Sequence, residues 1–255
     1  MKTCVLNLSG NVGKSTLAVH LLAAFAPGSK IISVESINAS NANDVEALNV
    51  EELSASRFKE IFREIMLNDE VIVDVGASNV AAFMTEMTRF KSAVGEFDLV
   101  LVPTVPADKQ QRDTIATVDW LHKLGIDGKK VRVLFNQYAT EGLEPIELVY
   151  AQVAGYGATD GKGKAVLEPH AVVALNEVYE LSKASKKTVM ELAQDNTDWK
   201  AARSAAKRAG DLVALERAMA GQMTHDLAVT AHENLSQVHR TLFPGATMAV
   251  KARTA

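Results

Sequence analysis

The sequence predicts an α/β fold in three layers, with a mostly parallel central sheet between helices and extra helices at the C-terminal end. Short apolar runs alternate with segments of helical periodicity along the first half of the chain. The runs are apolar throughout, which is typical of parallel strands covered by helices on both faces. Polar residues follow these runs directly, at the edge where parallel sheets bind ligands.

Each element is assigned from its apolar pattern and its flanking residues. The predicted strands are Thr3–Leu8, Lys30–Val34, Glu70–Val75, Asp98–Pro103 and Lys130–Phe135. Helical patterns cover Lys14–Phe25, Ser56–Leu67, Val80–Val94 and Thr114–Leu124. The glycine-rich segment Gly155–Lys164 is predicted to be a flexible, basic loop.

The chain is predicted to divide near residue 195, into a main domain at 1–195 and a C-terminal helical appendage at 196–255. Within the appendage, Trp199–Ala209 and Thr224–Phe243 have helical patterns, and Gly210 and Gly221 are expected to interrupt them.

Composition narrows the class of protein. Hydrophobic residues make up 47% of the 255 residues and charged residues 23%, which is enough for a buried core. The net charge is −4, so contact with nucleic acid requires a local basic patch. The single cysteine, Cys4, excludes an internal disulfide and a cysteine-ligated iron–sulfur cluster.

Location is inferred from the same composition. We expect a reducing, cytoplasmic setting, because one cysteine cannot pair and the N-terminus lacks a secretory pattern. No apolar run is long enough to span a membrane. The tail Gly245–Ala255 is too short and too weakly apolar for an amphipathic anchor, so no membrane contact is expected.

A phosphate-binding loop is predicted between the first strand and the first helix, where the sequence is S-G-N-V-G-K-S-T. Glycines let backbone N–H groups approach phosphate oxygens, and the N-terminus of the helix adds its dipole. The nucleotide-binding residues are predicted to be Gly10, Asn11, Val12, Gly13, Lys14, Ser15 and Thr16. Lys14 would reach the β and γ phosphates and the Ser15 hydroxyl would bind Mg²⁺. The alternative is an ordinary helix start with a capping hydroxyl.

Two carboxylates are candidates for the same chemistry. Asp74 closes an apolar strand, where such an acid holds Mg²⁺ or its water shell. Glu35 follows the second strand and would hold a metal-bound water. The alternative for Asp74 is an ordinary cap at the end of a strand, and for Glu35 it is a cap on the next turn.

Several stretches resemble ParA/MinD-type ATPases, which have a deviant form of this phosphate loop. Beside the loop they are V-I-V-D-V-G-A-S-N from Val71, D-L-V-L-V-P-T-V-P-A-D from Asp98, V-L-F-N-Q-Y from Val133 and A-V-L-E-P-H-A-V-V-A-L from Ala165. The resemblance covers roughly residues 1–195, and within the group it is closest to the StbB-type plasmid stability proteins.

The resemblance implies an ATP-binding switch that uses Mg²⁺ and forms a nucleotide-dependent homodimer. It implies action in plasmid stability, partition or conjugative DNA movement, with a DNA-binding adaptor protein as a partner. Asn136 matches the asparagine that contacts adenine, although an asparagine there would also serve simply to shape a turn.

Departures from the family pattern fall at catalytic positions. The signature lysine, which neutralises phosphate charge across the dimer, is replaced by Ser9, and the second glycine by Asn11. Glu35 keeps a carboxylate where the family has its first aspartate, but the second, linked to the attacking water, is Ile37. Isoleucine can neither orient water nor accept a proton. We therefore expect tight ATP binding with slow or absent hydrolysis.

A basic helix face is the candidate DNA contact. It consists of Lys200, Arg203 and Lys207, with Arg208 beside them. An adjacent apolar face contains Trp199, Ala202 and Ala206. The basic side would bind DNA phosphates without sequence preference, and the alternative is a solvated face on a helix that docks by its apolar side.

Two other classes of function stay open. One is a P-loop kinase or synthetase acting on a small molecule, which would need a second substrate and a closing lid. The other is a non-catalytic scaffold or interaction protein, an interpretation that Ser9 and Ile37 favour.

Overall fold

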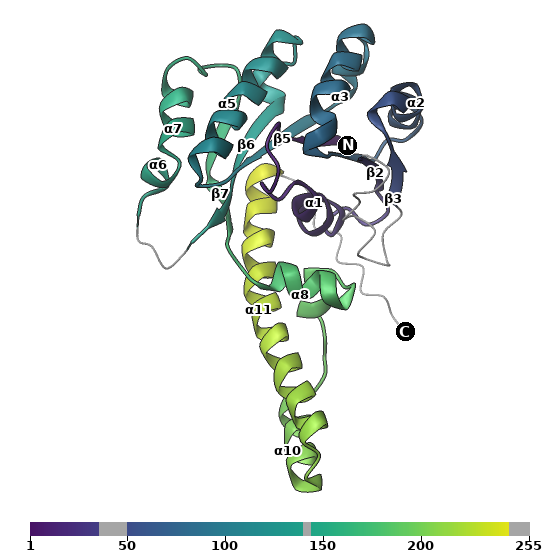
Figure 1. Cartoon of the computed structure of the whole chain (residues 1–255), viewed down its shortest axis with the longest axis vertical. Helices are drawn as coiled ribbons and strands as arrows, with labels where there is room; N and C mark the ends of the chain where they lie inside the picture. Colours follow the sequence, from purple (N-terminus) through teal and green to yellow (C-terminus); the bar gives the residue numbers. More distant parts are fainter. Residues whose placement is uncertain (36–49, 140–143, 245–255) are drawn as a thin grey trace.

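The computed structural model describes residues 1–35, 50–139 and 144–244. Its centre is a seven-stranded sheet in the order β3-β2-β4-β1-β5-β6-β7, and all the neighbouring strands pair in parallel (Figure 1). The strands are β1 (Lys2–Leu6), β2 (Lys30–Val34), β3 (Val50–Leu53), β4 (Val71–Val75), β5 (Leu99–Thr104), β6 (Val131–Tyr138) and β7 (Val166–Ala174). The predicted three-layer α/β fold is therefore confirmed.

The central strands are apolar because helices cover them on both sides. All five residues of β4 and all six residues of β5 are buried. Strand β3 lies at the edge beside β2, and its sequence V-E-E-L leaves charged side chains partly exposed. Edge strands do not require an apolar run, so the sequence analysis missed β3.

Two hydrophobic clusters hold the helices against the two faces of the sheet. One cluster includes Phe58, Phe83, Phe97 and Tyr150. It covers one face with η3 (Ala55–Arg57), α2 (Phe58–Leu67), α3 (Ala77–Arg89), α4 (Ala93–Glu96), α5 (Asp108–Lys123), α6 (Ile146–Val149) and α7 (Ala151–Ala158). The other covers the opposite face with α1 (Lys14–Leu17), η1 (Ala18–Ala23), α8 (Val178–Ser185), α9 (Val189–Ala193) and α11 (Leu212–Leu242).

The helix predicted at Lys14–Phe25 is present in altered form. It is α-helical for four residues and then continues as the π-helical segment η1, in which every residue is buried. A π-helix bonds each residue to the fifth one along the chain instead of the fourth, so its turns are wider than those of an α-helix. Hydrophobic periodicity cannot reveal such a change over a few residues.

The segment Gly155–Lys164 is not the flexible loop that we predicted. Its first part belongs to α7, and the turn that follows is fixed by side-chain contacts. Asp119 on α5 accepts hydrogen bonds from the Tyr156 hydroxyl and from Lys164 Nζ, both at 2.7 Å. The Tyr156 ring also lies against Gly161, where an added Cβ would come within 2.3 Å of it.

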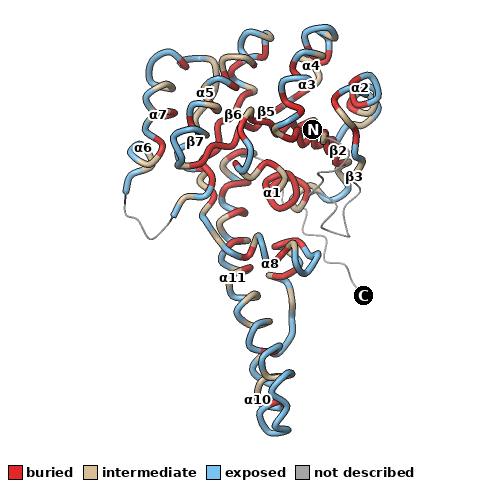
Figure 2. Tube along the Cα trace, viewed as in Figure 1, coloured by how far each residue is buried: buried red, intermediate tan, exposed pale blue. Residues whose placement is uncertain are grey.

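The C-terminal helices form a hairpin that projects from the sheet, as Figure 1 shows, and most of its outer part is exposed (Figure 2). Asp198 caps α10 (Trp199–Ala209), Gly210 ends it in the left-handed conformation, and Asp211 caps α11. Gly221 was expected to break the second helix, but α11 runs through it for 31 residues. The Trp199 ring packs against this glycine, where a Cβ would lie 2.4 Å away.

The C-terminal half of α11 packs on the sheet, and its side chains bond directly to the edge strand. Asn234 accepts a hydrogen bond from the Ala174 amide at 3.0 Å and donates one to the Val172 carbonyl at 2.9 Å. One helix side chain thus forms hydrogen bonds with two backbone groups on the free edge of β7. No helix in the described part of the chain is both long and apolar enough to cross a membrane.

Replacing Asn234 with alanine is expected to lower the free energy of unfolding by about 1–3 kcal/mol, because it leaves a backbone donor and an acceptor of β7 without partners. Urea denaturation measures the loss. Gln237→Ala, at an exposed position on the same helix, is the control and should change stability by less than about 0.5 kcal/mol. Equal losses in the two variants would contradict the role given to Asn234.

Candidate nucleotide-binding site

The loop between β1 and α1 has the backbone shape that a phosphate nest requires. Asn11 and Gly13 both adopt positive φ, at 58° and 82°. At Gly13 a Cβ would lie 2.2 Å from the Asn136 side-chain nitrogen, so only glycine fits there. The N-terminus of α1 begins at the next residue, Lys14.

Asn136 supports the loop from the end of β6. It is buried, and its Nδ2 atom donates to the Val12 carbonyl at 2.8 Å. Its own carbonyl accepts the Tyr150 hydroxyl at 2.8 Å. The contact of Asn136 with adenine remains a prediction, and the observed bond gives the residue a structural role as well.

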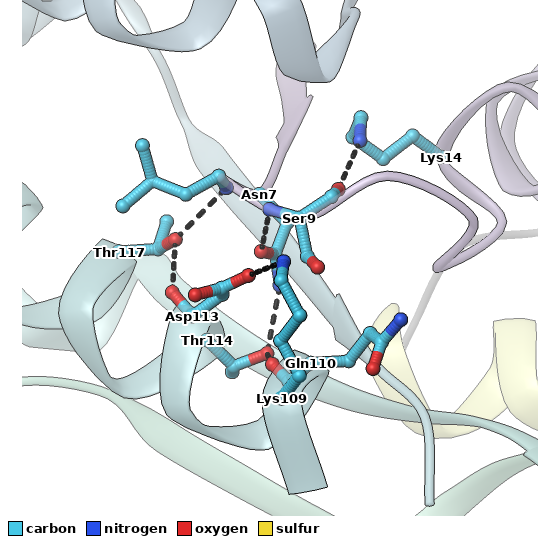
Figure 3. Close-up of polar contacts among 9 residues, drawn as sticks. Asn7, Ser9, Lys14, Lys109, Gln110, Asp113, Thr114 and Thr117 are labelled. Atoms are coloured by element: carbon cyan, nitrogen blue, oxygen red, sulfur yellow. Dashed lines mark hydrogen bonds and ion pairs between the residues drawn. The ribbon is translucent and has the colours of Figure 1, made fainter. Parts of the chain in front are cut away.

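A polar network fixes the start of the loop to α5 (Figure 3). Asn7 Nδ2 donates to the Pro103 carbonyl at 2.8 Å and to the Thr114 hydroxyl at 2.7 Å. Asn7 Oδ1 accepts from the Ser9 amide at 2.8 Å, and the Leu8 amide donates to Thr117 Oγ1 at 3.1 Å. The sequence analysis missed Asn7, because a polar residue after a strand predicts no particular partner.

Ser9, which occupies the position of the family's signature lysine, faces inward. It is 1% exposed, and its hydroxyl has no hydrogen bond of good geometry, although it lies close enough to Asp113 to lower the pKa of that carboxyl, after the larger effect of Lys109. Figure 3 shows the Ser9 side chain among α5 residues. Position 9 therefore presents no charge at the surface.

A pocket of about 590 Å³ opens above the loop. It is lined by Gly10, Asn11, Gly13, Lys14, Ser15, Thr16, Val19, His20, Glu35, Gly76, Ala77, Ser78, Gln137, Glu180 and Lys183. Most of the predicted phosphate-binding residues therefore meet in one cavity. Val12 and Asn136 do not line this pocket; they are joined by the bond described above, and Asn136 lines the adjoining pocket.

Lys14 is held in place by the loop itself. Its Nζ atom donates to the Ser9 carbonyl at 2.7 Å, and the side chain is largely buried. Burial lowers the pKa of Lys14, while Asp74 and then Glu35 act in the opposite direction. The ammonium group therefore lies near the carboxylates of Asp74 and Glu35, and a bound phosphate would add a further negative charge beside it.

Asp74 is a buried carboxylate without a hydrogen-bond partner. It lies in β4 between Val5 of β1 and Ser33 of β2, and is 1% exposed. Ser15 approaches it, but its hydroxyl does not reach the geometry of a full hydrogen bond. Burial raises the pKa of Asp74 to about 6, against the lowering effect of Ser15 and Lys14. An uncompensated carboxylate in this position is a group that a cation would stabilise.

Glu35 lines the pocket and brings a second carboxylate close to the buried Asp74. Its oxygens lie so close to Gly76 that an added Cβ there would be 2.1 Å from one of them. Together with the Ser15 hydroxyl and Asp74, Glu35 offers the hard oxygen atoms that Mg²⁺ prefers. Among the described residues there is no group of three or more His, Cys, Asp and Glu side chains that could hold a metal ion.

A second pocket of about 550 Å³ adjoins the first and shares Gly13, Thr16, Gln137 and Glu180 with it. Ala174 and Leu175, at the end of β7, line it together with Leu227 of α11. Ala174 and Leu175 belong to the stretch from Ala165 that resembles the late strand and loop near the base in ParA/MinD-type ATPases.

Other predicted residues lie elsewhere. Ile37 falls outside the described residues. Lys200, Lys207 and Arg208 are exposed on α10, and Arg203 is half-buried with its Nε atom unpaired against the hairpin. The apolar side of α10 packs on α11 through Trp199 and Ala206. None of these residues lines either pocket.

Comparison with solved structures shows that this fold is similar to that of MinD proteins. The MinD cell division protein of Aquifex aeolicus matches with a TM-score of 0.55 and 13% identity, over 97% of this chain and 98% of that one. In its complex with MinC the TM-score is 0.57. MinD of Pyrococcus furiosus matches with a TM-score of 0.50 and 12% identity, over 93% and 99%. The chain therefore has the α/β P-loop fold of the MinD-type ATPases. No family model and no curated protein sequence matches it.

Asp74→Asn is expected to stabilise the ligand-free protein at pH 7.5, by up to about 3 kcal/mol, because it removes an unpaired buried charge. The folded pKa lies above the unfolded value of 3.8, so this gain is complete above about pH 6 and disappears as the pH falls towards 4. Urea denaturation of both proteins at pH 7.5 and 4.5 measures the difference.

The same variant should lose the dependence of nucleotide affinity on Mg²⁺. A variant that is less stable than the parent at pH 7.5, or that keeps the full effect of Mg²⁺, would contradict the role assigned to Asp74.

Proposed function

We propose that this chain is a ParA/MinD-type ATP-binding switch, closest to the StbB-like plasmid stability proteins. Its role would be in plasmid stability, partition or conjugative DNA movement, in the cytoplasm. The observation that carries the proposal is a pocket at a phosphate loop that Lys14, Ser15 and Glu35 line, with the unpaired Asp74 buried close to these three residues. The MinD-type fold and the sequence motifs support it.

Each residue has a defined task in this proposal. Lys14 binds the β and γ phosphates, and the loop amides donate to their oxygens. Ser15 and Asp74 hold Mg²⁺, while Glu35 orients one of its waters. Bound Mg²⁺ would neutralise charge on the phosphates. Asn136 keeps the loop in shape and lies near the second pocket, where we place the base.

Hydrolysis by this site is proposed to be slow. A switch of this class is expected to pair as a homodimer around the nucleotide, and a lysine at position 9 would serve the partner's phosphates. Ser9 instead is buried against α5, so that position supplies no cation across an interface. The loss of such a charge costs several kcal/mol of barrier stabilisation.

The projecting hairpin is the surface that we assign to DNA. Three cations, Lys200, Lys207 and Arg208, are exposed on α10, on the part of the molecule that extends farthest from the sheet. Because these side chains lie away from the sheet and its covering helices, they can contact the phosphates of a DNA duplex without steric clashes. A DNA-binding adaptor protein would supply sequence specificity, which phosphate contacts alone lack.

Isothermal titration and light scattering test the switch. The parent protein should bind ATP with Mg²⁺ and change its oligomeric state, and a phosphate-release assay should detect little turnover. Lys14→Ala should weaken ATP binding by a factor of about 100 or more, since it removes a buried charge contact to phosphate. Lys91→Ala, at an exposed surface lysine, is the control.

Other results would identify the rival functions. Failure of the parent to bind ATP would favour a non-catalytic scaffold, an interpretation that the buried Ser9 supports. Binding without a change in size, followed by turnover only with a second substrate, would indicate a kinase or synthetase. Brisk ATP hydrolysis by the pure protein would overturn the slow-switch proposal.

Changing Lys200, Lys207 and Arg208 together to glutamine should weaken duplex binding about tenfold or more at low salt. It should also reduce the slope of log affinity against log salt by roughly 0.9 for each lost phosphate contact. Fluorescence anisotropy with unrelated duplexes measures both effects. The matched control changes Lys59, Lys91 and Lys123, all exposed elsewhere, and equal losses in both triple variants would refute the assignment to α10.

A further inference from the structure

Helix α8 brings an ion pair to the rim of the phosphate pocket. Glu180 and Lys183 both line the cavity, and they lie one helical turn apart. Lys183 and Lys14 are the two cations among the described residues that line it, because His20 is neutral. Burial, with a further contribution from Lys183, lowers the pKa of His20 to about 4.

The position of α8 indicates which phosphate of a bound nucleotide would lie near Lys183. Glu180 lines both the phosphate pocket and the adjoining pocket beside β7. Asp74 and Glu35, which mark the metal, belong instead to the strand ends next to Gly76. Lys183 lines only the phosphate pocket, but its Nζ atom lies 2.8 Å from Glu180 Oε1. Through this pair it lies on the side of the phosphate pocket that adjoins the second one, where the phosphate closest to the ribose would lie.

The pair between Lys183 and Glu180 is one that a ligand can break at little cost. Lys183 Nζ lies 2.8 Å from Glu180 Oε1, but the Glu180 side chain is 78% exposed and that of Lys183 40% exposed. Solvated pairs of this kind contribute little stability. A phosphate held by the loop is fixed in position and more strongly charged than a mobile carboxylate, so it competes well for the lysine.

The charge of the site also requires a second cation. A nucleoside triphosphate has more negative charge than Lys14 and one divalent ion neutralise, and Asp74 and Glu35 add to it. Position 9 contributes no positive charge, because a serine side chain is neutral.

We propose that Lys183 exchanges Glu180 for the α-phosphate of a bound nucleoside di- or triphosphate, and so supplies from the same chain a second cation for the phosphate tail. This inference rests on the proposed nucleotide-binding function. It assigns Glu180 the role of a competitor that holds the lysine while the pocket is free of nucleotide.

Titration of Lys183→Gln with adenosine, AMP, ADP and ATP tests the contact. Affinity for all three phosphorylated ligands should fall by a similar factor, about fivefold to twentyfold, the range of a partly exposed charge-assisted hydrogen bond. Affinity for adenosine should not change. Lys187→Gln removes the same charge from a nearby exposed position outside both pockets, and it should bind all four ligands as the parent does.

Glu180→Gln gives the complementary result, because it frees Lys183. Its affinity for ADP and ATP should rise about twofold to fivefold, a gain that a folding defect cannot produce. The gain should vanish when Lys183→Gln is present in the same chain. Circular dichroism establishes that each variant is folded.

Three results would overturn the inference. They are an unchanged affinity for ADP in Lys183→Gln, an equal loss for adenosine, and a loss confined to ATP, which would place the lysine at the γ-phosphate. If the parent binds ADP and ATP in a Lys14-dependent manner while any of these results is obtained, only the inference about Lys183 fails. If the parent binds none of the phosphorylated ligands, the proposed nucleotide function fails with it.

Discussion

The hydrogen bond between the Asn136 side chain and the Val12 carbonyl determines the shape on which the site depends. It joins the end of β6 to the turn after β1, and the left-handed Gly13 leaves room for it. Asn7 provides a second anchor by linking the start of the same turn to α5. With both ends fixed, the backbone amides of the loop can point towards a ligand without having to be ordered when it binds, which lowers the entropy cost of binding.

The same arrangement places the cation of Lys14 and the carboxylates of Asp74 and Glu35 close together in a largely buried space. The pKa values of Lys14 and Asp74 both shift in the direction that disfavours the charged form, and burial is the largest cause for each. A nucleotide with its metal ion reverses both costs at once, because it supplies a negative partner for the lysine and a positive one for the aspartate. The site would therefore favour a ligand that contains both charges over one that contains only the phosphates or only the metal ion.

Sequence patterns were sufficient where a local rule decides the structure, and insufficient where a distant contact does. Apolar runs located β1, β2, β4, β5 and β6 to within about three residues, because strands buried on both faces must be apolar. Gly221 was misjudged because the glycine makes room for the ring of Trp199, which packs on it from another helix. Asn7 was missed for a similar reason: its partners on α5 are about a hundred residues away. Lys183 has no motif, and only the fold brings it to the phosphate pocket.

Helix α11 is the element that relates the pocket to the projecting hairpin. Near its middle, Leu227 lines the second pocket and its carbonyl accepts a hydrogen bond from Asn176, while the N-terminal half carries α10. A helix of 31 residues spans about 46 Å, so a small rotation at Leu227 moves the tip much farther. A ligand biases such a rotation only if it contacts the two positions unequally. In the proposed switch Leu227 is the residue of α11 that a base in the second pocket would contact, so such a rotation would respond to the base-binding end of the nucleotide.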